Sequence, residues 1–224
     1  MIDYVKYIYD ENVRPKTDYP RKLINYLIAR LGIPQGSKIL DLGCGRGDFS
    51  QAFILSGMKV SAVDLSDWVT ENYENIDFKK CDFTKENLPY ETSSFDVIFS
   101  KSVIEHLYYP EKLFSEAKRI LKPGGVIITM CPSWEHNYRT YFDDFTHRTP
   151  FMKVSLHDFN ILLGFKNVQT EFFKQLPFAW DSKIGYFVTE LIRFLPVNFL
   201  KNKSKLVKFS KETMLLSIAK KNEE

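Results

Sequence analysis

Residues 38–50 read KILDLGCGRGDFS, and this stretch decides the fold of the chain. It begins with a short apolar run, which is typical of a buried strand, and glycines then alternate with other residues at Gly43, Gly45 and Gly47. After Asp48 the apolar residues recur at helical spacing. Strand, glycine turn and helix together are the layout of a nucleotide-binding loop, because glycines let the backbone turn sharply and let a ligand approach the main chain.

The spacing of the glycines separates this loop from two common alternatives. A dinucleotide-binding turn has the pattern GxGxxG, and here Asp48 stands where its third glycine would be. A P-loop needs Gly-Lys-Ser/Thr, which the stretch lacks. The acid Asp41 followed by GxGxG resembles instead the first motif of class I S-adenosylmethionine-dependent methyltransferases. The resemblance implies S-adenosylmethionine as cofactor and S-adenosylhomocysteine as product. A glycine turn without a ligand is the alternative.

A second acid lies where an adenosine ligand needs one. Residues 59–63 are expected to form a strand that ends at Asp64-Leu65, about 20 residues beyond the glycine loop. An acid at this distance can hydrogen-bond both ribose hydroxyls. The alternative for Asp64 is a helix N-cap. A weaker strand over residues 76–80 leads to Asp82 and Phe83, and the resemblance implies that these two residues contact the adenine.

The next segments extend the resemblance from about residue 23 to residue 131. Residues 93–100, SSFDVIFS, resemble the fourth strand of the family, and LKPGG at 121–125 precedes another apolar strand. His106 resembles the histidine of the family's E-H-L segment, and we expect it to be structural rather than a base. The predicted cofactor-binding residues are Asp41, Gly43, Cys44, Gly45, Gly47, Asp64, Leu65, Asp82, Phe83, Ser100 and Lys101.

Alternating strands and helices predict an α/β, Rossmann-like, doubly wound sheet of seven strands, mostly parallel. We expect an antiparallel final strand at 214–219 and a helical insertion before it. The whole chain, 1–224, is interpreted as one class I methyltransferase domain with an N-terminal arm (1–19), a substrate loop (132–152) and a helical, basic insertion (175–211). Tyr4, Tyr7 and Arg14 of the arm are lid candidates, although a simple surface arm is the favoured interpretation.

The loop after the fifth strand is where substrate choice is expected. Its segment 144–151, DFTHRTPF, looks like one found in methyltransferases linked to sugar and surface-polysaccharide biosynthesis, with the arginine displaced by one position. Methyl transfer to an oxygen needs an aligned acceptor and removal of its proton. We predict His147 as the base and Asp144 (or Asp143) as its orienting partner; the alternative is that His147 only holds the loop.

The same loop supplies the predicted substrate contacts. Arg148 could hold an anionic group, and Tyr138 and Tyr141 could pack against the rings of the acceptor. The acids and histidines of this loop have no metal-ligand spacing, so no metal is expected.

The composition of the chain limits the classes of partner that we expect. A net charge of +3 is too small to indicate nucleic acid, and three separated cysteines without a signal segment are typical of a cytoplasmic protein. The segment 184–211 combines an amphipathic pattern with lysines, so it could contact a membrane surface, cover the cleft or form a dimer contact. The expected acceptor is a small molecule or saccharide, and the expected state is a monomer or homodimer. Alternatives are a lipid-linked or quinone-type, nucleic-acid or protein acceptor, or a non-catalytic S-adenosylmethionine-binding protein.

Overall fold

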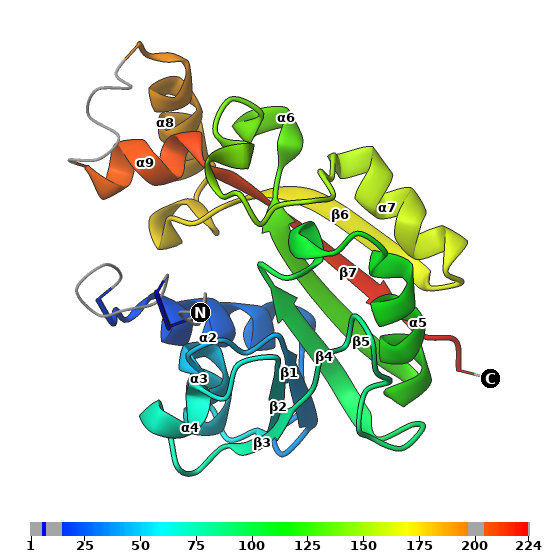
Figure 1. The fold of residues 1–224 in the computed structure, drawn as a ribbon. Helices are drawn as coiled ribbons and strands as arrows, with labels where there is room; N and C mark the ends of the chain where they lie inside the picture. The colour runs from blue at the N-terminus through cyan, green and yellow to red at the C-terminus, as the bar shows by residue number, and fades with distance from the viewer. Residues whose placement is uncertain (1–5, 8–14, 197–203, 224) are drawn as a thin grey trace.

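A seven-stranded sheet runs through the centre of the molecule (Figure 1). The computed structural model describes residues 6–7, 15–196 and 204–223. The strand order is β3-β2-β1-β4-β5-β7-β6. The first five strands pair in parallel, and β7 is antiparallel to both of its neighbours, which confirms the predicted sheet. The strands are β1 (Lys38–Leu42), β2 (Lys59–Asp64), β3 (Asp77–Lys80), β4 (Phe95–Lys101), β5 (Leu121–Pro132), β6 (Lys166–Lys174) and β7 (Thr213–Lys220).

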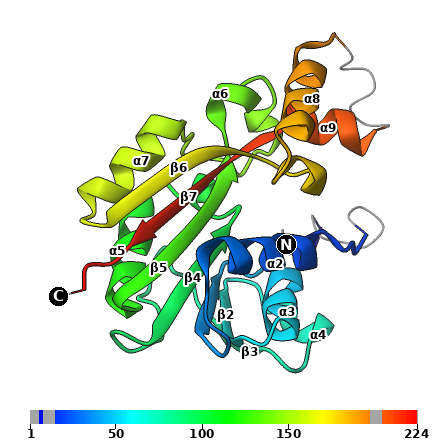
Figure 2. The same ribbon diagram turned by 180° about the vertical axis from the view of Figure 1, so that it is seen from behind.

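Helices cover both faces of the sheet, as the two opposite views show (Figures 1 and 2). The α-helices are α2 (Tyr19–Leu31), α3 (Asp48–Leu55), α4 (Val69–Asn72), α5 (Pro110–Ile120), α6 (Trp134–Asn137), α7 (Lys153–Leu162), α8 (Lys183–Phe194) and α9 (Lys205–Lys211). Three 3₁₀ turns are η1 (Ile104–His106), η2 (Tyr141–Asp143) and η3 (Pro177–Ala179).

The alternation of side chains along the strands creates two cores. On β1, Ile39 packs with α2 and α3, whereas Leu40 and Leu42 face the opposite core, which contains α5 and α7. On β4, Phe99 joins the first of these cores and Ile98 joins the second. Successive strand residues point to opposite faces, so apolar runs without polar alternation need helices on both sides. This is why the central strands are doubly covered.

The structure differs from the sequence prediction at β5. The predicted strand began at residue 126, but β5 begins at Leu121 and continues through Pro123 and the glycines that follow. Leu121 pairs with Phe95 and Val126 with Val97, so the strand contains an irregularity that absorbs the extra residues. Leu121 is buried in the core, and this burial fixes the start of the strand.

Several sequence predictions concern the N-terminal arm and the helical insertion, which the structure describes only in part. Tyr4 and Arg14, two of the three lid candidates, lie outside the described residues. The third, Tyr7, is exposed. The insertion contains α8 and α9, and its lysines at 201 and 203 also lie outside the described part. None of the helices within the described ranges has both the length and the apolarity needed to cross a bilayer. The domain boundaries stay a prediction.

Candidate active site

The glycine loop between β1 and α3 is held close to the neighbouring strand ends. The amides of Gly43 and Cys44 donate to the Val63 carbonyl at the end of β2, at 2.8 and 3.2 Å. Gly43 has a φ of +78°, and a Cβ on it would lie 2.2 Å from Cγ2 of Val103, just after β4. A side chain at this position would therefore collide with the segment that follows β4, so the glycine is required by both conformation and space.

Asp41, at the end of β1 just before this loop, has a buried carboxyl. Its Oδ2 accepts a hydrogen bond from Ser50 Oγ at 2.5 Å, and the residue is 2% exposed. Burial raises the pKa of Asp41 to about 7, against the opposing effect of the Ser50 hydrogen bond. A cationic ligand group beside Asp41 would favour the charged carboxylate, and the ammonium of an amino acid has the required charge.

Asp64 is oriented by backbone amides at the end of β2. Its Oδ2 accepts from Gly45 N at 2.8 Å and its Oδ1 from Ser66 N at 2.9 Å. A carboxylate has about four acceptor sites, so two backbone donors and two ribose hydroxyls can share it. Leu65 next to it is exposed at the rim. The glycine loop and the predicted ribose-binding acid are thus joined in one unit.

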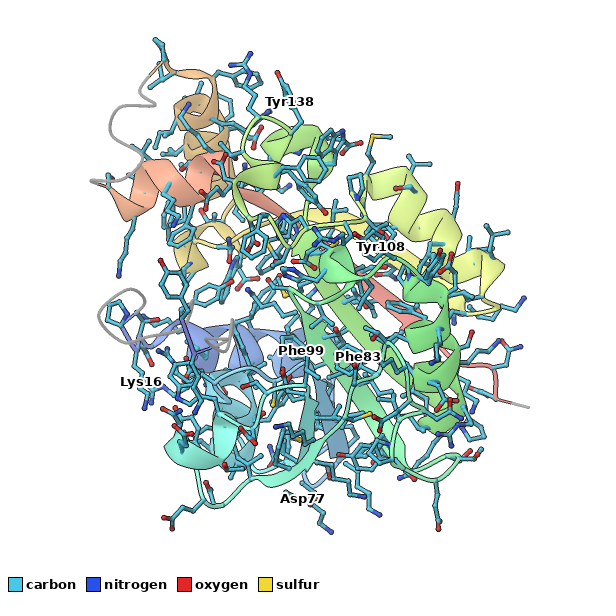
Figure 3. All side chains as sticks on the ribbon, in the orientation of Figure 1. Lys16, Asp77, Phe83, Phe99, Tyr108 and Tyr138 are labelled. Atoms are coloured by element: carbon cyan, nitrogen blue, oxygen red, sulfur yellow. The ribbon has the colours of Figure 1, made fainter. Side chains whose placement is uncertain are left out.

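Asp82 and Phe83, the predicted adenine contacts, interact with neighbouring residues of the protein. Asp82 Oδ1 accepts from Thr84 N and Oγ1, at 3.2 and 2.5 Å, and its Oδ2 pairs with Lys85. These bonds hold the pKa of Asp82 below its usual value, chiefly through Lys85. The carboxylate therefore shapes its own turn, and its contact with adenine stays a prediction. Phe83 is half-buried against the core near the middle of the view in Figure 3.

Ser100 and Lys101, the two predicted cofactor contacts at the end of β4, differ in their accessibility. Ser100 is 1% exposed, so its side chain lies inside the fold. Lys101 points to the side of the glycine loop, since its Nζ lies 5.4 Å from the ring centroid of Phe49 in α3. Lys101 is therefore the member of this pair that can border a ligand.

The predicted substrate loop is folded and packs on the residues that follow β4. Its ends meet in a bridge between Ser133 and Phe151. Arg148 N donates to the Glu105 carbonyl at 2.7 Å, and Thr149 Oγ1 donates to the Leu107 carbonyl at 2.6 Å. The loop therefore lies on the residues that follow β4, and this contact brings His147 to the carboxyl ends of the strands.

His147 has a defined tautomer in this arrangement. Its Nδ1 lies 2.5 Å from the Tyr141 carbonyl oxygen. A carbonyl can only accept, so Nδ1 carries the proton and Nε2 carries the lone pair. Asp144, the predicted orienting partner, uses Oδ1 to accept from Thr146 N and Oγ1. A backbone carbonyl therefore orients the His147 ring, and the role of Asp144 as its orienting partner stays a prediction.

The three predicted substrate contacts, Tyr138, Tyr141 and Arg148, lie in different surroundings. Tyr141 is 2% exposed, and its hydroxyl donates to the Thr149 carbonyl at 2.7 Å. Tyr138 lies at the upper edge of the molecule beside α6, far from Phe83 (Figure 3). Arg148 donates from its guanidinium to two carbonyls of its own loop and lies 5.3 Å from the ring centroid of Tyr108. The Tyr141 hydroxyl is thus used within the fold, and the substrate roles of Tyr138 and Arg148 stay predictions.

Sequence reasoning missed Glu105, the residue next to His106 in η1. Glu105 is 1% exposed, and neither carboxyl oxygen has a hydrogen-bond partner among the described residues. His106 Nδ1 lies 2.8 Å from Thr146 Oγ1, and burial lowers the pKa of His106 to about 4. The ring centroids of His106 and His147 are 4.9 Å apart. The only sequence signal was the Glu-His pair itself, because His147 comes from a distant loop.

Comparison with known proteins agrees with this geometry. Residues 40–129 match the methyltransferase domain family. Phosphoethanolamine N-methyltransferase 2 of Caenorhabditis elegans is 32% identical over 179 residues, which are 73% of this chain and 38% of that protein. A ubiquinone biosynthesis O-methyltransferase of Actinobacillus pleuropneumoniae is 31% identical over 103 residues, 41% of this chain and 44% of that protein. The chain thus spans less than half the length of these relatives.

The fold extends the similarity beyond the matched residues. The structure of a SAM-dependent methyltransferase from Archaeoglobus fulgidus superposes with a TM-score of 0.65 at 21% identity, covering 98% of this chain and 100% of that one. The family match lies on the part of the chain that carries the glycine loop, Asp64 and Asp82. All the predicted cofactor-binding residues, from Asp41 to Lys101, lie within the stretch that matches the methyltransferase domain family.

Proposed function

We propose that this chain, with its methyltransferase domain at residues 40–129, transfers a methyl group from S-adenosylmethionine to an oxygen of a small molecule or saccharide. One observation supports this most directly. The docking of residues 133–151 onto the segment after β4 joins His147 to the edge of the sheet that carries the glycine loop. The predicted cofactor-binding loop and the predicted base are therefore at the same edge, an arrangement that supports methyl transfer to a hydroxyl.

The proposed reaction is an in-line displacement. Asp41, Asp64 and the glycine loop hold the cofactor, and the acceptor hydroxyl lies against the loop that contains His147. As the new oxygen–carbon bond forms, the carbon–sulfur bond breaks and its electron pair neutralises the sulfonium. The hydroxyl proton passes to Nε2 of His147, whose lone pair is fixed by the Nδ1 contact with Tyr141. Arg148 binds an anionic group on the acceptor.

An exposed apolar helix favours an acceptor presented at a lipid surface. On α8 the side chains of Ile184, Phe187 and Leu191 are 78%, 61% and 51% exposed. Their spacing puts them on one stripe of the helix. The helix α9, which carries Lys205, Lys208 and Lys211, packs beside α8 (Figure 1). An apolar stripe next to cations suits the peripheral membrane contact proposed for residues 184–211, and with it a lipid-linked acceptor.

Two measurements test the proposal. Calorimetric titration of the folded protein with S-adenosylhomocysteine should give micromolar binding, and incubation with S-adenosylmethionine and pools of sugar and lipid-linked acceptors should release S-adenosylhomocysteine. His147→Ala should leave cofactor binding unchanged and lower turnover by about 10²- to 10⁴-fold, the range expected for loss of acid–base catalysis. His157→Ala, on α7, is the matched control. Absence of binding would refute the cofactor site, and unchanged turnover in His147→Ala would refute the role of this histidine.

A further inference from the structure

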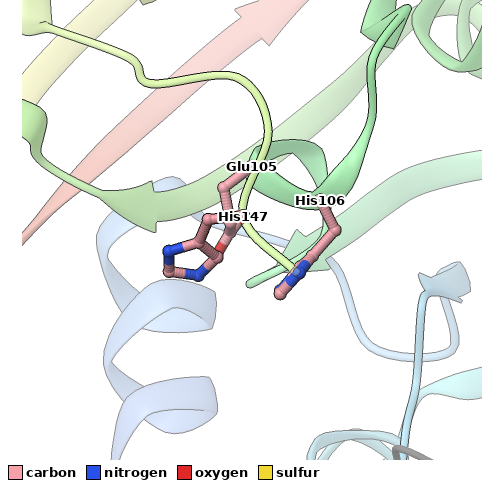
Figure 4. A group of neighbouring side chains, drawn as sticks. All are labelled: Glu105, His106 and His147. Atoms are coloured by element: carbon pink, nitrogen blue, oxygen red, sulfur yellow. The ribbon is translucent and has the colours of Figure 1, made fainter. Parts of the chain in front are cut away.

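Glu105, His106 and His147 form a compact group of side chains at the end of β4 (Figure 4). Glu105 and His106 come from η1, and His147 comes from the docked loop. One ligand atom from each residue lies within 4.8 Å of the other two. Figure 4 shows both imidazole rings on the same side of η1, with the Glu105 carboxyl behind the His147 ring. Two residues local in sequence and one from a loop about forty residues away thus converge on one point.

Glu105 is the unusual member of this group. Its two oxygens are buried and have no hydrogen-bond partner among the described residues. Its backbone carbonyl, by contrast, accepts from the amides of Arg148 and Thr149. A buried carboxylate without donors is costly, and proteins compensate it with a proton, a cation or a metal ion. The carboxyl of Glu105 therefore points to a ligand that the side chains around it do not supply.

The two histidines are held in the tautomer that suits metal ligation. Thr146 Oγ1 has one proton, and it donates this proton to Asp144 Oδ1 at 2.5 Å. Thr146 Oγ1 must then accept from His106 Nδ1, just as the Tyr141 carbonyl accepts from His147 Nδ1. Both rings therefore carry their proton on Nδ1 and their lone pair on Nε2. A metal-bound histidine commonly donates its other ring N–H to an oxygen acceptor in this way.

We propose that Glu105, His106 and His147 bind one divalent transition-metal ion. Two imidazole nitrogens and one carboxylate oxygen form a three-ligand set of the kind that leaves a position open for water or substrate. Zn²⁺ and Mn²⁺ are suitable ions, since imidazole suits the first and carboxylate the second. The group lies beside the proposed acceptor position, because His147 reaches it through the docked loop.

The role of the ion deepens the proposed function and rests on it. The acceptor hydroxyl would take the open position, and coordination would lower its pKa, so its proton passes to solvent water. The metal-held oxygen then attacks the methyl carbon, the carbon–sulfur bond breaks and S-adenosylhomocysteine leaves. In the metal-loaded protein this step replaces the direct proton transfer to His147 Nε2 that the proposed function describes, because that nitrogen then binds the ion.

Metal binding can be tested without any acceptor. The full chain, stripped with EDTA and dialysed, is titrated calorimetrically with ZnCl₂ and MnCl₂, and Co²⁺ is added separately to record its visible spectrum. We expect one ion per chain and intense Co²⁺ bands typical of four- or five-coordinate sites. Glu105→Gln, which keeps the shape of the side chain, and His147→Ala should each weaken binding by about 100-fold or more, since each removes one of three protein ligands. His157→Ala should bind as the wild type does.

The outcomes separate this proposal from the function it rests on. Folded wild-type protein that takes up no ion, or binding that Glu105→Gln and His147→Ala leave unchanged, would overturn the metal site. S-adenosylhomocysteine titrations of the same samples report on the cofactor site independently. If methyl transfer is found, EDTA-stripped protein should lose turnover and regain it with the added ion; full turnover without metal would overturn the catalytic role.

Discussion

Replacing Asp64 by asparagine tests whether the end of β2 holds the cofactor. The asparagine keeps one acceptor oxygen, and its NH₂ group would face one of the two backbone amides that now donate to the carboxylate, Gly45 N at 2.8 Å or Ser66 N at 2.9 Å. The loss of charge also weakens bonds to the ribose hydroxyls. A hydrogen bond to a charged group contributes about 1.5–3 kcal/mol and a neutral one about 0.5–1.5 kcal/mol, so losing one ribose bond and neutralising the acceptor of the other should cost about 3 kcal/mol of binding free energy.

That energy corresponds to an affinity for S-adenosylhomocysteine about 100-fold lower. The assay is calorimetric titration of the wild type and of Asp64→Asn, with thermal unfolding to confirm that the variant is folded. Asp67→Asn is the matched control, because Asp67 is an exposed acid three residues away that pairs with Lys80. Affinity within about threefold of the wild type in a folded Asp64→Asn sample would refute the assignment, since a factor of three is below 1 kcal/mol.

Three further predictions concern the loop, the buried acid and α8. Gly43→Ala should destabilise the protein by about 2–5 kcal/mol, from a positive φ and the contact with Val103, and a Val103→Ala background should reduce this cost to about 1–2 kcal/mol in chemical denaturation. Burial raises the folded pKa of Asp41 to about 7, so its contribution to stability is complete below about pH 4 and is lost as the pH rises through 7. Asp41→Asn should reduce the loss of stability between about pH 4 and 7, leaving the part that comes from Glu105, whose pKa burial also raises; a loss as large as in the wild type would contradict this. Ile184→Glu with Leu191→Glu should lower co-sedimentation with anionic vesicles about tenfold or more without changing cofactor affinity, and equal sedimentation would exclude α8 as the contact.

The part of the fold that is predicted to bind the cofactor could be derived from the sequence because its sequence signals are local. The glycine loop, Asp64 at the end of β2 and the apolar run of β4 are each contained in a few adjacent residues. Each also fixes a backbone shape, and parallel strands place their carboxyl ends at one edge. The order of these segments was enough to give the sheet. The start of β5 was missed because Pro and Gly at 123–125 are strong turn signals, which the pairing of Leu121 with Phe95 overrides.

The acceptor half depends on contacts between distant residues, so it could be predicted only in outline. The fold adds a contact that sequence spacing did not indicate, between His147 Nδ1 and the Tyr141 carbonyl oxygen, and the roles of His147 as base and Asp144 as its partner stay predictions. Glu105 stood in a segment that reads as the end of a strand. Its burial depends on the docking of a loop about forty residues later, through the amides of Arg148 and Thr149. No local pattern encodes that docking.

The helix α8 shows why periodicity predicts an element more reliably than its orientation. An apolar stripe normally faces the core, yet here the inward side carries Gly185 and Thr189, both buried. A Cβ on Gly185 would lie 2.5 Å from the Phe178 carbonyl oxygen, so the helix packs too closely for a larger residue. The Lys174–Glu190 ion pair, at 2.7 Å, joins the polar side of α8 to the end of β6. The buried Lys174 needs a compensating charge, and its pairing with Glu190 holds α8 in an orientation that leaves the apolar stripe exposed among the described residues.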